Sequence, residues 1–169
     1  MAENFSAEGY VVLAPDTYRG SVASTVPGAL ALRLSADTVR VESAMMAAFA
    51  YLAEQPNVDL DRIAVMGFCF GGGVALRHGV ENPQIAATIN LYGDVIDNPD
   101  DFGPLLDSGR PILGIFGAAD QQIPVSEVEA FETALEQAGI PHTVNVYPPM
   151  PHAFVHPGNI GEPGEPQNA

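Results

Sequence analysis

The chain has 169 residues, of which 47% are hydrophobic, and this is enough apolar material for one globular domain with a sizeable core. Its 21 acidic residues against six arginines and no lysine give a net charge of −15, which argues against nucleic-acid and anionic-membrane partners because these need a basic surface. No apolar run approaches the roughly 20 residues that span a bilayer. The N-terminus lacks a secretory signal pattern, and the chain has a single cysteine. We therefore expect a cytoplasmic protein.

Five short apolar runs predict strands, and helix-like or polar segments separate them. The runs cover residues 9–14, 62–67, 86–92, 111–117 and 143–147. Continuous apolar strands separated by helix-length segments are typical of a parallel sheet that is covered on both faces. We therefore predict an α/β fold with a doubly wound, mostly parallel sheet.

Three helices and a tail are also predicted. Residues 36–54 show helical spacing of apolar side chains, and a short buried helix is expected at residues 72–78. Ser126 and Glu129 resemble a capping box at the start of a helix that ends at Gly139. We expect a single domain over residues 1–156, followed by an extended or disordered tail at residues 157–169.

A cysteine flanked by glycines lies where the second strand is expected to pass into a helix. In the pattern Gly67-x-Cys69-x-Gly71, a turn this tight leaves room at the flanking positions only for hydrogen or a very small side chain. It holds the central residue in a strained backbone region, and the N-terminus of the following helix favours a thiolate and a developing oxyanion. We predict that Cys69 is a nucleophile; the alternative is a buried structural cysteine beside a glycine turn.

Two residues further along the chain can complete such a site. Asp120 follows the fourth predicted strand and His152 follows the fifth, and the order nucleophile, aspartate, histidine is typical of α/β-hydrolases. Both lie just past the carboxyl end of a strand, where open α/β sheets build their sites. We expect His152 to be the base and Asp120 to orient it. The alternatives are a turn or helix-cap aspartate and a loop histidine among prolines.

The other histidines carry weaker predictions. His78 falls inside the helix after Cys69, where packing or capping is expected, and His142 opens the last strand away from the site. His156 is a candidate for the pocket lining. No cluster has metal-ligand spacing, and the glycines after Cys69 match no dinucleotide or phosphate-binding pattern, so neither a metal nor a cofactor is predicted.

These residues together resemble the dienelactone hydrolases, α/β-hydrolase-fold enzymes with a cysteine nucleophile. The matching stretches are residues 8–18, 67–72, 91–93, the loop at Asp120, and residues 152–154. The resemblance implies hydrolysis of small carboxylic esters or lactones through a thiolester intermediate, without a cofactor. It also implies an oxyanion hole that uses the backbone N–H of Phe70, and substrate-binding positions at Arg19, Tyr92 and His156.

Two parts of the family pattern have no counterpart in this sequence. A strand expected before residues 9–14 is absent, together with a glutamate and a second oxyanion donor from its loop, and the final helix is absent too. We therefore expect a truncated α/β-hydrolase fold. Because each unpaired buried backbone group costs about 1–3 kcal/mol, either the strands at 9–14 and 62–67 pair directly, or a second copy covers the exposed edges, or the chain is a fragment. A homo-oligomer, and specifically a dimer, is the expected solution.

Two further functions fit the same residues. A relative with weakened catalysis would keep the pocket as a small-molecule-binding or oligomerising module, because losing one oxyanion donor costs about 100–1000-fold in rate. A thiol-based redox or acyl-transfer protein would use Cys69 alone. The leading prediction is a hydrolase that acts on a small-molecule ester or lactone.

Overall fold

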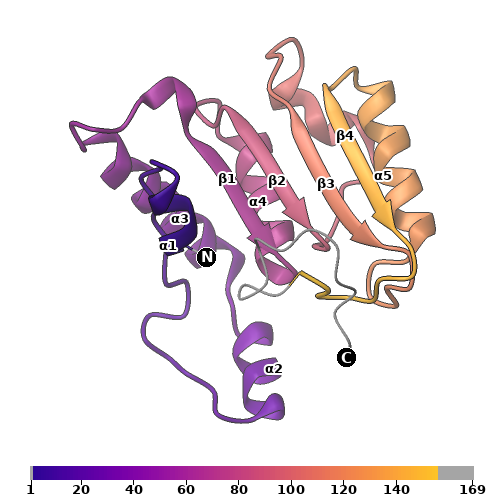
Figure 1. Ribbon diagram of the computed structural model, residues 1–169, viewed down its shortest axis with the longest axis horizontal. Helices are drawn as coiled ribbons and strands as arrows, with labels where there is room; N and C mark the ends of the chain where they lie inside the picture. The colour runs from indigo at the N-terminus through magenta and orange to yellow at the C-terminus, as the bar shows by residue number, and fades with distance from the viewer. Residues whose placement is uncertain (1, 156–169) are drawn as a thin grey trace. The chain divides into compact units, whose positions relative to one another are not determined.

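A computed structural model of the chain describes residues 2–155 and divides them into two compact units, residues 2–60 and the residues from 61 onward. The first unit is helical, and the second contains a four-stranded sheet with its own helices. Figure 1 shows the elements of both units. The single domain predicted for residues 1–156 stays a prediction, and the predicted tail at residues 157–169 lies outside the described residues.

The first unit contains three helices with side-chain caps on two of them. They are α1 (Ala2–Ala7), α2 (Val26–Leu34) and α3 (Thr38–Ala53). The Thr25 hydroxyl accepts from the N–H of Gly28 at the start of α2, and the Asp37 carboxylate accepts from the N–H of Val39 at the start of α3. The helix predicted at residues 36–54 is confirmed by α3. Within residues 2–155, no helix is long and apolar enough to cross a bilayer.

The strand predicted at residues 9–14 is wrong. Residues 10–14 form no helix or strand, and no described residue of the first unit is in a strand with which they could pair. A strand needs backbone hydrogen bonds from a neighbour, so an apolar run without a neighbour stays irregular. Tyr10, at the start of this run, is 62% exposed.

The other four predicted strands are confirmed and form one parallel sheet in the order β1-β2-β3-β4. A short 3₁₀ turn, η1 (Leu60–Arg62), precedes them. The strands are β1 (Ala64–Phe68), β2 (Ala87–Leu91), β3 (Ile112–Gly117) and β4 (His142–Tyr147). Each strand pairs in parallel with the next. The α/β fold with a parallel sheet is therefore confirmed.

Three helical segments connect the strands. They are α4 (Phe70–Glu81), the 3₁₀ segment η2 (Pro99–Leu105) and α5 (Val125–Gln137). The predicted end of α5 is confirmed, because Gly139 takes the left-handed φ of +67° just past the helix. The predicted capping box is wrong: α5 begins after Pro124, which caps it without a side-chain bond, so Ser126 already lies inside the first turn.

The core lies between the sheet and these helices. The ring of Phe116 in β3 packs against Phe131 in α5, and Phe131 in turn packs against Phe102 in η2. All three rings are fully buried. In the view of Figure 1, α4 lies behind β1 and β2, and α5 lies alongside β4. The sheet therefore rests on a layer of helices that hold its carboxyl edge in place.

Arg110, just before β3, joins two of these helical segments. Its guanidinium donates to four backbone carbonyls, those of Gly79, Asn82, Ile85 and Pro104. Burial lowers the pKa of Arg110 from its usual value, yet the group keeps its role as a donor because arginine stays protonated far above neutral pH. One side chain thus joins the C-terminal end of α4 to η2.

We expect Arg110→Met to lower the free energy of unfolding by about 2–3 kcal/mol, because hydrogen bonds to a charged group are lost and buried carbonyls are left without a donor. Urea unfolding followed by circular dichroism measures this change. Arg77→Met is the matched control, since Arg77 is exposed on α4. Equal stability of the two variants would contradict the role of Arg110.

The outer edge of β1 generates a second prediction. β1 pairs with β2 on one side, and no strand among the described residues pairs with its other side. An open edge of unpaired N–H and C=O groups favours pairing with another chain, so we expect a homodimer in solution. Light scattering over a range of concentrations tests this. Added salt should increase the dimer fraction by screening the charge of −15 on each copy. A monodisperse monomer that unfolds cooperatively would count against the dimer.

Candidate active site

The parallel register brings the three predicted site residues to one edge of the sheet. Phe68 in β1 lies opposite Leu91 in β2, so the strands end side by side. Cys69 follows β1 directly, Asp120 lies in the loop after β3, and His152 lies in the loop after β4. The carboxyl edge of the sheet is therefore where segments up to 83 residues apart in sequence meet.

Cys69 occupies the strained turn that the sequence predicts. Its backbone takes φ 52° and ψ −123°, which for a residue other than glycine costs about 1–3 kcal/mol. Three hydrogen bonds hold it there: its N–H donates to Leu91 O at 3.0 Å, and its carbonyl accepts from the N–H groups of Gly72 at 2.9 Å and Gly73 at 3.3 Å. The turn is thus fixed both to β2 and to the first turn of α4.

The crowding around this turn differs in one respect from the prediction. A Cβ on Gly67 would overlap the carbonyl oxygen of Gly71, so the requirement for glycine at residue 67 is confirmed. Nothing outside its own helix lies within 4 Å of a Cβ built on Gly71, so the predicted crowding there is wrong. The second crowded position is Gly72, where a Cβ would run into the side-chain oxygen of Asn90.

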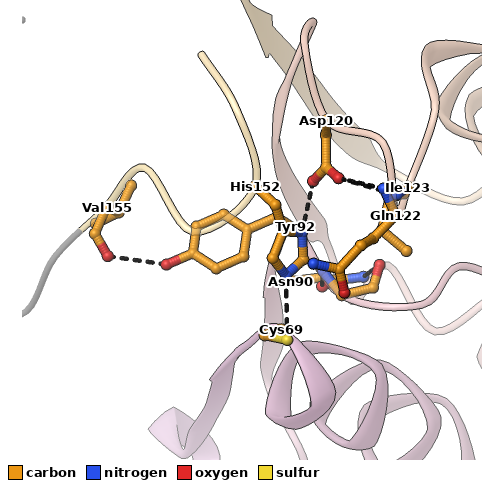
Figure 2. Close-up of polar contacts among 9 residues, drawn as sticks. Cys69, Asn90, Tyr92, Asp120, Gln122, Ile123, His152 and Val155 are labelled. Atoms are coloured by element: carbon orange, nitrogen blue, oxygen red, sulfur yellow. Dashed lines mark hydrogen bonds and ion pairs between the residues drawn. The ribbon is translucent and has the colours of Figure 1, made fainter. Parts of the chain in front are cut away.

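A line of hydrogen bonds connects the three side chains (Figure 2). His152 Nε2 lies 3.1 Å from Cys69 Sγ, and His152 Nδ1 lies 2.7 Å from Asp120 Oδ2. The carboxylate can only accept, so Nδ1 carries a proton toward it and Nε2 faces the thiol. This arrangement allows a proton to move between sulfur and Nε2 while Asp120 holds the imidazole in one tautomer.

Asp120 is held by the backbone of its own loop. Its Oδ1 accepts from the N–H of Gln122 at 2.7 Å and from the N–H of Ile123 at 3.0 Å, which leaves Oδ2 for His152. The carboxylate is fully buried, whereas 15% of the His152 side chain is exposed. Asp120 is therefore also the turn aspartate of the alternative prediction, because one carboxylate oxygen closes the turn and the other contacts His152.

Asn90 and Tyr92, at the end of β2, also contribute to the site, and the sequence analysis predicted no supporting role for either of them. Asn90 is fully buried; it accepts from the N–H of Gly93 at 2.9 Å and donates to the carbonyl of Asp94 at 3.1 Å. Tyr92 lies in the chain between Asn90 and Gly93 and takes a left-handed φ of 42°. A polar residue inside an otherwise apolar strand was the available signal for Asn90, since buried polar groups in strands need a specific partner.

Tyr92 lies against His152. Their ring centroids are 5.3 Å apart in an edge-to-face arrangement. The Tyr92 hydroxyl donates to the carbonyl of Val155 at 2.8 Å (Figure 2). Burial, with a smaller contribution from the nearby charge of Cys69, raises the pKa of Tyr92 to about 12. Its hydroxyl therefore remains a donor throughout the neutral range.

The roles predicted for three further residues stay predictions. Phe70 is the first residue of α4, directly after Cys69, and its predicted role as oxyanion donor stays a prediction. Arg19 lies in the first unit at a left-handed φ of 53°, and its predicted substrate contact also stays a prediction. His156 lies outside the described residues.

The two other histidines lie where the sequence predicts. His78 is buried within α4, with its Nε2 3.4 Å from the Asn82 amide nitrogen, and His142 is the first residue of β4. Within the described residues 2–155, no three or more histidine, cysteine, aspartate or glutamate side chains are grouped so that they could hold a metal ion.

Comparison with known proteins places this geometry in a family. The model of the dienelactone hydrolase family matches residues 1–168. A carboxymethylenebutenolidase homologue of Xenopus tropicalis is 31% identical over 167 residues, which are 94% of this chain and 64% of the relative. A protein of Yersinia pestis that is named for carboxymethylenebutenolidase activity is 32% identical over 111 residues, 62% of this chain and 42% of the relative.

Solved structures agree with these matches. A dienelactone hydrolase-type protein of Klebsiella pneumoniae shares 29% identity with a TM-score of 0.75, covering 89% of this chain and 67% of its own. A structure described as m3DLH shares the fold, with 24% identity, a TM-score of 0.78 and coverage of 98% and 69%. The chain spans 42%, 54% and 61% of three of the curated relatives. With the family model matched along nearly its whole length, the chain belongs to the dienelactone hydrolase family.

Proposed function

We propose that the chain hydrolyses small carboxylic esters or lactones, with Cys69 as the nucleophile, His152 as the base and Asp120 as the residue that orients it. The observation that carries the proposal is the contact of His152 Nε2 with Cys69 Sγ at 3.1 Å, on a cysteine held in a strained turn before a helix. Family membership and relatives named as carboxymethylenebutenolidases, a name that denotes a lactone substrate, support the same reaction class.

In the first half of the reaction, sulfur attacks the carbonyl carbon of the substrate. His152 takes the thiol proton on Nε2, and Asp120 stabilises the imidazolium through Nδ1. The negative charge that develops on the carbonyl oxygen lies at the N-terminal end of α4, where the helix dipole and the N–H of Phe70 favour it. The tetrahedral species collapses to a thiolester, and the leaving alcohol takes the proton from His152.

In the second half, water replaces the alcohol. His152 removes a proton from the water as it attacks the thiolester carbonyl, and then returns that proton to sulfur. The products are an acid and an alcohol, or a single hydroxy acid if the substrate is a lactone, because the leaving alcohol stays attached. The cycle uses only the three side chains and water. Arg19 and His156 remain the proposed substrate-binding positions, whereas Tyr92, which is buried against His152, is proposed to act through the histidine and not on the substrate.

We expect Cys69→Ala to reduce turnover of p-nitrophenyl acetate and of an aryl lactone on the order of 10³-fold or more, because the nucleophile is removed. Cys69→Ser should retain an intermediate rate, since a hydroxyl yields its proton less readily than a thiol. Steady-state kinetics measures both variants, with circular dichroism to verify folding. If Cys69→Ala turns over both substrates at the wild-type rate, the hydrolase proposal is wrong.

The same assay separates the alternative functions. A binding or oligomerising module would show no turnover that depends on Cys69, yet would bind the lactone by calorimetry. A redox or acyl-transfer protein would show a thiol that reacts with iodoacetamide, while His152→Ala would leave the rate unchanged.

Asp120→Asn tests the orienting role separately. The amide keeps an oxygen that can accept from the N–H groups of Gln122 and Ile123, but its NH₂ group faces Nδ1, so the imidazole is driven into the tautomer that places a hydrogen on Nε2. Because Nε2 can then no longer take the thiol proton, we expect kcat to fall by about 10³- to 10⁴-fold, as in serine triads. Stopped assays at pH 7 measure this; a fall of less than tenfold would contradict the role.

A further inference from the structure

The hydrogen bond from His152 to Asp120 fixes only one atom of the imidazole. It holds Nδ1 at 2.7 Å from Oδ2, but the ring can still rotate about this contact and move Nε2 away from sulfur. A second contact is needed to hold the plane of the ring. The ring of Tyr92 provides one, with centroids 5.3 Å apart and planes at 65°.

Tyr92 also holds the backbone that carries His152. Its hydroxyl donates to the carbonyl of Val155 at 2.8 Å, and its ring lies 5.7 Å from that of Phe154. The segment from His152 to Val155 contains Ala153 at a left-handed φ of 59°. Such a conformation persists only where neighbouring contacts impose it. Tyr92 thus contacts the histidine loop at His152 and again three residues further on.

Tyr92 is itself rigidly placed. It is 3% exposed, its N–H donates to the carbonyl of Ile115 at 2.8 Å, and the Asn90 side chain ties the next two residues to the end of β2. Its own φ of 42° is maintained by these contacts. The side chain therefore joins the rigid sheet to a loop that has no strand or helix of its own after β4 within the described residues.

We propose that Tyr92 is a positioning residue, which holds the imidazole of His152 at hydrogen-bonding distance from Cys69 through its ring and anchors the histidine loop through its hydroxyl. This inference rests on the proposed hydrolase function and adds to it the contacts that direct His152 Nε2 toward Cys69 Sγ. Because burial keeps the hydroxyl protonated up to about pH 12, the anchor to Val155 is present wherever the enzyme works.

Two variants separate the parts of this role. Tyr92→Phe keeps the ring against His152 and removes only the bond to Val155, whereas Tyr92→Leu removes both. Tyr147→Phe is the matched control: Tyr147 lies at the end of β4, its ring contacts Phe154, and it is 45% exposed.

Positioning acts on the chemical step, so the variants should lower kcat and leave KM within about twofold. Displacing a reacting group by about 1 Å can cost about 100-fold, so we expect losses of about tenfold for Tyr92→Phe and about 100-fold for Tyr92→Leu. Tyr147→Phe should keep the wild-type kcat. Folding is verified by circular dichroism at the assay temperature. If Tyr92→Leu does not fold, Tyr92→Phe, which preserves the ring, decides alone.

A second measurement does not depend on ester turnover. The rate at which iodoacetamide alkylates Cys69, followed against pH, reports the contact between sulfur and His152. We expect the pH profiles of the Tyr92 variants to move from that of the wild type toward that of His152→Ala, further for Tyr92→Leu than for Tyr92→Phe. A structural role for Tyr92 would lower thermal stability without moving this profile.

The outcomes distinguish the inference from the hydrolase proposal. If the wild type shows no ester turnover that depends on Cys69 but the alkylation profile moves in the Tyr92 variants, the hydrolase proposal fails and the positioning role stands. If folded Tyr92→Phe matches the wild type in both kcat and alkylation profile, the positioning role is overturned, whatever the wild type hydrolyses.

Discussion

The close approach of α4 to the sheet is the constraint on which the site depends. A Cβ on Gly67 in β1 would overlap the carbonyl of Gly71, so the N-terminal end of α4 touches β1. A Cβ on Gly79 would overlap the hydroxyl of Thr88 in β2, so α4 touches β2 near its C-terminal end. These contacts fix the point at which Cys69 leaves the strand, and with it the strained conformation of its backbone. A larger residue at Gly67 would push α4 away, and displacing the proposed nucleophile by about 1 Å can cost about 100-fold in rate.

The buried polar groups of the site each join a structural bond to a functional one. Asp120 closes its own turn with Oδ1 and contacts His152 with Oδ2. Asn90 satisfies the backbone of Gly93 and lies against Gly72 in the first turn of α4, which follows Cys69. Leaving a buried polar group without its partner costs about 1–3 kcal/mol, so the bonds that stabilise these turns also restrict the positions of the catalytic candidates. The side chains of the site are therefore held in position by hydrogen bonds at the ends of the strands.

What the sequence predicts well is local, and what it misses depends on neighbours. Four strands, and the placement of Cys69, Asp120 and His152 just past strand ends, follow from apolar runs and from the turn at Gly67, because each signal lies within a few residues. The run at residues 9–14 has the same apolar signal but lacks a strand beside it, so it stays irregular. Tyr92 is the opposite case: its contact with Val155 spans 63 positions, and no local pattern reports such a pairing.

The position of β1, the strand that leads into Cys69, gives the site its particular character. β1 forms the edge of the described sheet, so hydrogen bonds to β2 hold it on one side only. An edge strand is more easily displaced than a central one, since half of its backbone groups lack a partner strand. The glycine contacts with α4 and the bond from Cys69 N–H to Leu91 O therefore supply the restraint that a second neighbouring strand would otherwise add. His152 meets Cys69 at this restrained point: its Nε2 lies 3.1 Å from Sγ, while β2 and α4 hold the backbone N–H and carbonyl of the same residue.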